Sequence, residues 1–381
     1  MGIKLTLLIV FFAVMVGVGL YSRKHTASVD GFVLGGRSVG PWLTAFAYGT
    51  SYFSAVVFVG YAGQFGWKYG IASTWIGIGN AVIGSLMAWV VLGRRTKVMT
   101  QHLGCKTMPD FFGERYGSKV LKIMASAIVF VFLVPYTASI YNGLSRLFEM
   151  AFHIPYAYCV AGMAVFTGIY VILGGYMATA INDFIQGIIM LIGIVAVIAA
   201  VLSGQGGFLE AIRKMAEIPS DLPVTMGQPG AFTSFFGPDP WNLFGVIILT
   251  SLGTWGLPQM IGKFYAIKDE KSINTGTVIS TLFACVVAGG SYFLGGFGRL
   301  FDSSEIYDET GSVVFDSIVP HMLSSLPDLL IGIVVVLVLS ASMSTLASLV
   351  LTSSSTLTLD FLKDNVMRNM SEKKQIRWMK F

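Results

Sequence analysis

The chain has 381 residues, of which 54% are hydrophobic and 12% charged, and its formal net charge is +5. A soluble domain ordinarily has about 25% charged residues, so this composition excludes a soluble globular protein. Long apolar runs separated by short polar loops predict an all-α polytopic membrane protein, in which the basic excess reflects topology rather than nucleic-acid binding.

About nine runs approach the ~20 apolar residues that a helix needs to cross a bilayer. The first run is followed by Arg23 and Lys24 and lacks a small-residue cleavage pattern, so we expect a helix rather than a signal peptide. In chain order, the predicted spans are 3–22, 41–66, 71–93, 123–147, 156–174, 180–203, 241–262, 274–298 and 329–359.

The distribution of lysine and arginine between the loops predicts the orientation. With nine spans, three basic loops and the basic tail all lie on one face, whereas one helix more or fewer would place them on alternating faces. We therefore expect an outside amino terminus, a cytoplasmic tail and a multi-pass protein of the plasma membrane. The basic loop residues are Arg23, Lys24 and Arg37, then Arg94, Arg95, Lys97, Lys106, Arg115, Lys119 and Lys122, and finally Lys263, Lys268 and Lys271.

One carboxylate stands clearly inside an apolar run. Asp183 has Asn182 and Gln186 nearby and lies just inside the expected cytoplasmic end of the span 180–203. Burial of a charge at membrane depth costs at least about 2.5 kcal/mol, which favours a functional role. The alternative is an interfacial residue that caps the start of the helix.

Two further segments combine hydroxyls with small residues inside apolar runs. Residues 49–54 favour an unwound backbone, and Ala341, Ser344, Thr345 and Ser348 share one helix face. A single hydroxyl often bonds only to its own helix, but the density here exceeds what a lipid-facing helix needs. Hydroxyls without a fixed charge suit a monovalent cation better than Mg²⁺ or Ca²⁺, so the two segments predict the halves of a sodium site.

Several ordered motifs carry a resemblance to a known family. The chain resembles the sodium:solute symporter family, which includes proline, pantothenate, monocarboxylate, sialic acid and glucose cotransporters. The matching motifs are Leu34-Gly35-Gly36-Arg37-Ser38, Tyr52-Phe53-Ser54-Ala55, Gly174-Gly175 through Asn182-Asp183 and Gln186-Gly187, Gly256-Leu257-Pro258-Gln259, and Met343-Ser344-Thr345.

The resemblance implies a leucine-transporter-like bundle of two inverted five-helix repeats. It divides the chain into an extra helix and cytoplasmic loop (1–40), a first repeat (41–203), an extracellular loop (204–240), a partial second repeat (241–360), and a tail or the start of a missing helix (361–381). Because the second repeat supplies only three spans, we expect a sequence truncated at its carboxyl end.

The resemblance also implies the ion ligands. They are the backbone carbonyls of Thr50, Phe53 and Ala341 and the hydroxyls of Ser344 and Thr345. Asp183 and Ser348 fall where the family has a sodium-release path or, in some members, a second sodium. That second site wants a hydroxyl where Ala347 stands, so one sodium per cycle is expected.

The solute is less constrained. Proline carriers have an acidic residue in place of Tyr52 and aromatics in place of Thr250 and Thr254, which weakens that assignment, whereas the local motifs look most like the pantothenate branch. We expect a small, carboxylate-bearing solute such as pantothenate, a monocarboxylate or an amino acid such as proline. The candidate solute-binding residues are Tyr52, Val56, Tyr136, Thr254, Trp255 and Gln259.

The function predicted is sodium-coupled symport by alternating access. Its partners are Na⁺, the solute and the bilayer, without nucleic acid or an obligate protein partner. Scattered histidines argue against an enzyme, and the lack of a GxxxxGK[ST] motif argues against a primary pump. The alternative is a transport-inactive membrane sensor or a degenerate, truncated transporter that binds sodium or solute without net transport.

Overall fold

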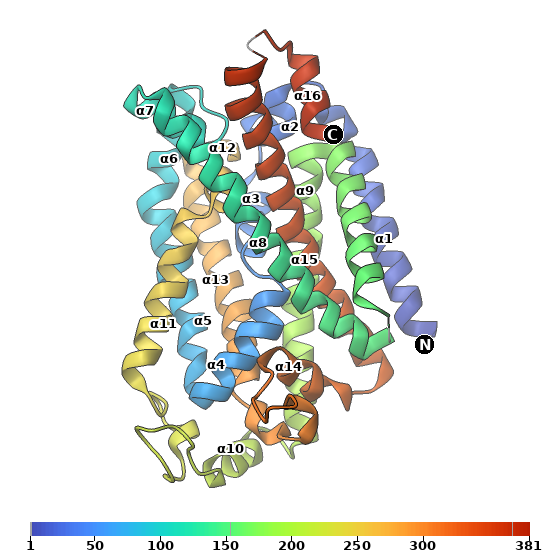
Figure 1. Cartoon of the computed structure of the whole chain (residues 1–381), viewed down its shortest axis with the longest axis vertical. Coiled ribbons are helices and arrows are strands. Elements are labelled where there is room, and N and C mark those ends of the chain that lie inside the picture. The colour runs from blue at the N-terminus through green and yellow to red at the C-terminus, as the bar shows by residue number, and fades with distance from the viewer. Residues whose placement is uncertain (1, 153, 368) are drawn as a thin grey trace.

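The computed structural model describes residues 2–152, 154–367 and 369–381. Helices roughly parallel to the long axis form a bundle (Figure 1). Within the described ranges the only β-structure is two isolated bridges, Val39 with Ile267 and Tyr307 with Val313. The prediction of an all-α membrane fold is confirmed.

The helices differ widely in length. The longer elements are α1 (Gly2–Ser22), α3 (Pro41–Thr50), α8 (Lys119–Phe152), α9 (Tyr156–Gly204), α11 (Pro240–Gly253), α13 (Glu270–Gly295) and α15 (Asp328–Ser355). The shorter α-helices are α2 (Val29–Leu34), α4 (Ala62–Tyr69), α5 (Thr74–Gly79), α6 (Arg94–His102), α7 (Met108–Tyr116), α10 (Phe208–Glu217), α12 (Pro258–Ala266), α14 (Phe315–Ser324) and α16 (Glu372–Lys380). Wider π-helical turns occupy Val56–Tyr61, Asn80–Met87, Trp89–Gly93 and Thr356–Val366.

In the described part of the chain, six helical stretches are long and apolar enough to cross a membrane. A seventh is the pair Pro240–Gly256 and Pro258–Ala266, which is bent by 51°. Two of the six are far longer than one crossing requires, with 47 and 45 residues. Each of these two folds back on itself.

The stretch Val56–His102 reverses at Gly70, which has φ +59°. Before this glycine, successive residues contact α13 at points ever closer to its carboxyl end. After the glycine, the contacts move back toward the amino end of α13. In chain order, the neighbours are Gly49 with Phe283, Gly66 with Gly295, Gly77 with Gly289, and Ser85 with Ser280. A side chain at Gly70 would strike the Phe232 carbonyl, so the tight turn requires glycine.

Helix α9 reverses in the same way at Gly175, where φ is +54°. Its first leg runs along α1 and its second leg returns. In chain order, the neighbours are Phe166 with Phe12, Tyr170 with Gly19, Gly174 with Ser22, and Asn182 with Met15. With the two reversals, the described residues pass through the bundle nine times, as the sequence predicted, although a single glycine replaces the loop expected between 174 and 180.

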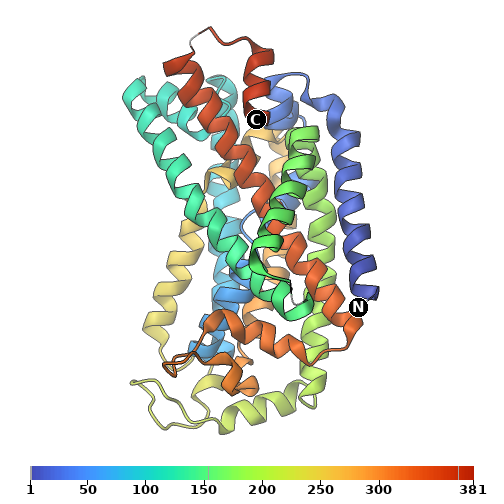
Figure 2. The same ribbon diagram turned by 45° about the vertical axis from the view of Figure 1, so that its right-hand side comes forward.

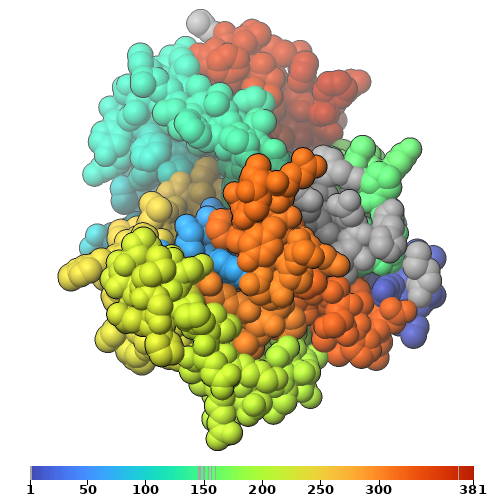
Figure 3. All heavy atoms as spheres, turned by 60° about the horizontal axis from the view of Figure 1, so that its bottom comes forward, coloured from blue at the N-terminus to red at the C-terminus, as the bar shows by residue number. Residues whose placement is uncertain are grey.

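The basic loops meet at one end of the bundle. Lys106 pairs with Asp30 at 3.1 Å, and the Val29 amide donates to Glu372 of α16 at 2.9 Å. These contacts lie at the upper end in Figures 1 and 2, near the carboxyl terminus, while α1 begins toward the lower end. Figure 3 shows that lower end, which the segments around α10 and α14 cover.

Glycines bring the backbones of α4 and α13 into direct contact. A Cβ on Gly66 would overlap the Gly295 carbonyl, and one on Gly295 would overlap the Ala62 carbonyl. Small residues allow such close approach in membranes, where no hydrophobic force joins the helices.

We expect Gly66→Ala to lower the thermal unfolding midpoint, because overpacking costs about 1–3 kcal/mol and a backbone cannot rotate away. The control is Gly245→Ala on α11, where an added Cβ has no atom within 4 Å. Thermal unfolding of both purified variants in detergent measures the difference. Equal midpoints for the two variants would contradict the close contact.

Candidate functional site

The second pass is broken at its centre. Helix α3 ends at Thr50, residues 51–54 are not helical, and a π-helical turn begins at Val56. Carbonyls at the end of a helix have no following turn to bond with. The break therefore leaves backbone oxygens of α3 available in the interior of the bundle.

Helix α15 crosses this break and contributes two hydroxyls. Ser344 Oγ lies 3.1 Å from the Thr50 carbonyl oxygen and 3.0 Å from that of Ala341. Thr345 Oγ1 lies 3.2 Å from the carbonyl oxygens of Thr50 and Phe53 and 3.1 Å from that of Ala341. Thr50, Ala341, Ser344 and Thr345 are fully buried, and Phe53 is 1% exposed. We name these five oxygens the oxygen cluster.

The oxygen cluster has more acceptors than protons. Five close contacts join its atoms, yet the two hydroxyls carry only one proton each. Each carbonyl oxygen has two lone pairs, so the cluster keeps acceptor capacity that a cation can use. An uncharged set of carbonyls and hydroxyls suits a weakly held monovalent ion.

Two further serines of α15 fasten the broken segment. Ser342 Oγ accepts from the Ala55 amide at 3.3 Å, where the helix restarts. Ser51 and Ser348 hydroxyls lie 3.1 Å apart on the other side of the break. Both ends of the unwound segment are thus held against the same helix.

Asp183 lies in the bundle interior and not at an interface. It is on the returning leg of α9, has no solvent exposure, and is 3.5 Å from Lys263 Nζ through Oδ2. The same Nζ donates to Ser348 Oγ at 3.0 Å. The helix-cap alternative is therefore wrong for this residue, because a buried cation faces its carboxylate.

Lys263 is the residue of this region that sequence analysis missed. It was counted with the basic loop residues, but it lies on α12 and is 2% exposed. The bend before α12 turns its side chain inward. Lys263 lies four residues after Gln259 and therefore shares its face of the short helix that follows Pro258. This spacing is the sequence signal that could have indicated an inward-facing lysine.

A cavity of ≈ 540 Å³ adjoins the unwound segment. Four predicted solute-binding residues line it, namely Tyr52, Val56, Tyr136 and Thr254. Trp255 and Gln259 do not, since Trp255 Nε1 donates to the Ile83 carbonyl at 2.9 Å and Gln259 lines a separate, narrow cavity beside Lys263. The predicted set is divided between two places.

Aromatic rings and uncharged polar groups make up the walls of the larger cavity. Among the described residues that line it none is charged. Besides the four above, its walls include Ser54, Val57, Tyr61, Gln64, Phe65, Asn80, Ser139, Val246, Leu249, Thr250, Gly253, Leu257 and Tyr292. Such a cavity suits a small organic molecule with an apolar body and a few polar groups.

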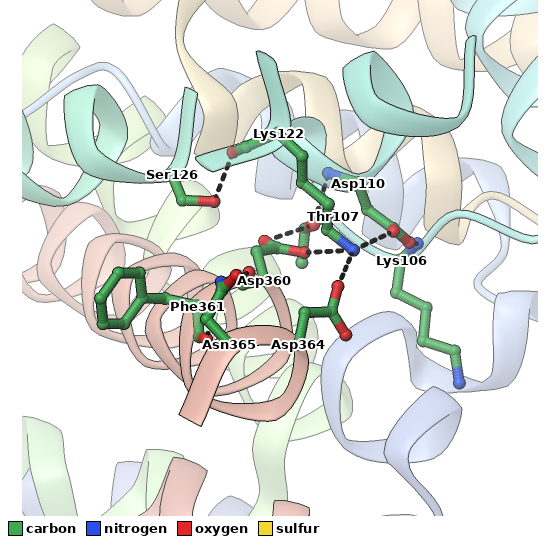
Figure 4. Close-up of polar contacts among 9 residues, drawn as sticks. All are labelled: Lys106, Thr107, Asp110, Lys122, Ser126, Asp360, Phe361, Asp364 and Asn365. Atoms are coloured by element: carbon green, nitrogen blue, oxygen red, sulfur yellow. Dashed lines mark hydrogen bonds and ion pairs between the residues drawn. The ribbon is translucent and has the colours of Figure 1, made fainter. Parts of the chain in front are cut away.

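A separate polar cluster anchors the far end of α15 (Figure 4). Lys122 Nζ lies 2.8 Å from Asp110, 2.6 Å from Asp364 and 3.7 Å from Asp360. Asp360 is 1% exposed and also accepts from the Thr107 hydroxyl at 2.7 Å. One lysine at the start of α8 therefore holds the π-helical continuation of α15 against α7 and α8.

The sequence and the fold of this chain are similar to those of sodium-coupled transporters. The family model described as "Sodium:solute symporter family" matches residues 32–381. Sodium/proline symporters of Staphylococcus aureus strains JH9 and JH1 are each 32% identical over 364 residues, which cover 93% of this chain and 67% of theirs. A solved structure of a Na⁺-coupled sialic acid symporter, in a substrate-bound outward-open state, has the same fold with a TM-score of 0.81 at 14% identity. The superposition covers 99% of this chain and 77% of that one.

Proposed function

Since the chain belongs to the sodium:solute symporter family, we propose that it carries a small carboxylate-bearing solute across the membrane together with sodium. The chain is a multi-pass membrane protein and not an enzyme. The observation that carries the proposal is the oxygen cluster, which joins the broken second pass to α15 in the interior of the bundle.

The proposed sodium ligands are the five atoms of the oxygen cluster. Sodium there would satisfy the surplus lone pairs of Thr50, Phe53 and Ala341 and would draw in the two hydroxyls. Binding would fix the position of α15 relative to the unwound segment. Release requires these two elements to separate, which gives the ion control over the conformation.

The unwound segment also explains coupling to the solute. Tyr52 and Ser54 line the large cavity, while the carbonyls of Thr50 and Phe53 belong to the oxygen cluster. An ion that orders this segment therefore orders one wall of the cavity. By linkage, the solute must strengthen sodium binding by the same factor. A membrane potential contributes about 2.3 kcal/mol per charge per 100 mV to inward movement.

The carboxylate of the proposed solute needs a positive partner. The described lining residues include no cationic side chain, so in this proposal the carboxylate pairs with the adjoining sodium ion. Relatives named sodium/proline symporters make proline one compound to test, and the local motifs make pantothenate another. Pyruvate represents the monocarboxylates.

The breaks also support the expected repeat organisation. The second pass is unwound after Thr50 and the seventh is bent by 51° before Pro258, and these two passes begin the expected repeats at 41 and 241. Broken helices in corresponding positions are the mark of inverted-repeat transporters. The joined basic loops support a cytoplasmic upper end and an outside amino terminus.

Uptake into sealed liposomes tests the proposal. The full chain should accumulate labelled proline, pantothenate or pyruvate only under an inward sodium gradient, and a sodium ionophore should abolish the accumulation. Accumulation that ignores sodium would contradict symport. Binding without accumulation would favour the transport-inactive alternative.

A cavity-filling variant tests where the solute binds. Val56→Trp should lower solute uptake severely while leaving sodium binding intact, because the indole would occupy the cavity beside Tyr136. The control is Val82→Trp on the exposed face of the π-helical turn Asn80–Met87. The readouts are solute uptake and equilibrium binding of ²²Na⁺. Unchanged uptake by the Val56 variant would place the solute elsewhere.

A further inference from the structure

We propose that the Lys263 ammonium occupies the position of a second monovalent cation, so that the chain carries a tethered positive charge there and binds one sodium ion. The inference rests on the proposed function and adds a role for Lys263. It predicts that removal of the ammonium opens a second sodium site.

The surroundings of Lys263 Nζ form a cation site in their own right. Ser348 Oγ lies at 3.0 Å, Asp183 Oδ2 at 3.5 Å and the centre of the Tyr176 ring at 5.1 Å. Ser51 Oγ extends this set through its 3.1 Å contact with Ser348. A carboxylate, two hydroxyls and an aromatic face are all groups that stabilise a positive charge.

The Lys263 ammonium does not satisfy this set of oxygens. Asp183 Oδ1 and Oδ2 accept no hydrogen bond from the described residues, and Oδ2 is held only by its ion pair with Lys263. A buried carboxylate requires one compensating positive charge, but which cation supplies it is not determined by the carboxylate. A sodium ion, without directional donors, could bind Asp183, Ser348 and Ser51 together.

The tethered charge lies next to the oxygen cluster. Ser51 follows Thr50 directly, and Ser348 is one helical turn beyond Ser344 on the same face of α15. Two free sodium ions in these adjoining positions would repel each other. In the chain as it stands, Lys263 and Asp183 neutralise each other, so sodium in the oxygen cluster brings one uncompensated charge.

The position is also reachable from the basic end of the bundle. A narrow cavity of ≈ 40 Å³ is lined by Lys263, Ser348 and Gln259, and its walls continue to Lys106 and Thr107 near α7. The vacated place would therefore adjoin a cavity that has polar walls. It would not be a sealed apolar hole that stays empty after a lysine is truncated.

Counting bound sodium tests the inference. Equilibrium binding of ²²Na⁺ to the full chain in lipid nanodiscs should give one ion per chain, and Lys263→Ala should give two. The Asp183→Ala/Lys263→Ala double variant, which removes both charges, should return to one. Lys263→Arg should also give one, and exposed Lys268→Ala is the surface control.

Two ions in the unaltered chain, or one ion in folded Lys263→Ala, would overturn the inference. If Lys263→Ala does not fold, the count for the unaltered chain and its sodium-to-charge ratio from reversal potentials still decide the matter, since a ratio of two sodium ions contradicts it. A purely structural role for Lys263 would change stability without changing the number of ions. Absence of any sodium binding to the unaltered chain would instead defeat the proposed function.

Discussion

Replacing Thr345 with alanine should raise the sodium concentration for half-maximal uptake by roughly 10- to 100-fold. Thr345 Oγ1 is the atom that touches most of the oxygen cluster, with three carbonyl oxygens within 3.2 Å. Loss of an interaction with a charged partner costs about 1.5–3 kcal/mol, which corresponds to this range of affinity. Ser344→Ala should have the same direction, because its hydroxyl contacts two of those carbonyls.

The measurement is the sodium dependence of ²²Na⁺ binding and of solute uptake. Thr345→Ser retains the hydroxyl and should recover most of the affinity, so it separates a ligand from a packing methyl. Ser354→Ala is a matched control on the same helix, since among the described residues that hydroxyl bonds only back to the Leu351 carbonyl, at 3.2 Å. Unaltered sodium dependence in Thr345→Ala would remove this residue from the proposed ion site.

Replacing Lys122 with methionine should lower the stability of the protein more than Gly66→Ala does. Its ammonium is the shared partner of Asp110, Asp360 and Asp364, and Asp360 is 1% exposed. Removal of one partner from a buried ion pair costs about 3–5 kcal/mol, because the remaining charge is left without compensation. Figure 4 shows the three carboxylates gathered around the Lys122 ammonium, so its removal would leave them facing one another without that cation.

The thermal unfolding midpoint of the purified variant measures this loss. A second replacement, Asp360→Asn, should recover part of it, since the buried charge is removed and the Thr107 hydroxyl can still donate to the amide oxygen. Lys119→Met, at an exposed position one turn earlier on α8, should leave the midpoint near that of the unaltered chain. A midpoint that falls equally in both lysine variants would contradict the assigned role.

Part of the candidate site could be predicted from the local sequence. Ser344 and Thr345 belong to a hydroxyl-rich stripe inside an apolar run, and a helix that faces lipid does not need so many hydroxyls. The small and polar residues 49–54 favour an unwound backbone. The two halves lie 294 residues apart in the chain yet within 3.1 Å in space. The family resemblance, and not the pattern alone, paired them, and their role as sodium ligands stays a prediction.

The sequence also determined the class, the nine passes and the end at which the basic loops meet. Each follows from averages over many residues, such as the length of an apolar run or the sum of lysines in a loop, and errors at single positions cancel. The reversal at Gly175 was located within a few residues for the same reason, although it needed no polar loop.

Tertiary structure alone decided the surroundings of single side chains. The direction of Lys263 depends on the bend before α12, and the separation of Gln259 from the solute cavity depends on where that helix packs. Two of the three carboxylates around Lys122, Asp360 and Asp364, come from a segment about 240 residues away in the chain. A charged residue near the end of an apolar run has the same local pattern whether it faces water or a buried partner. The choice between them is made by the free energy of packing and desolvation in the assembled bundle, which no local pattern contains.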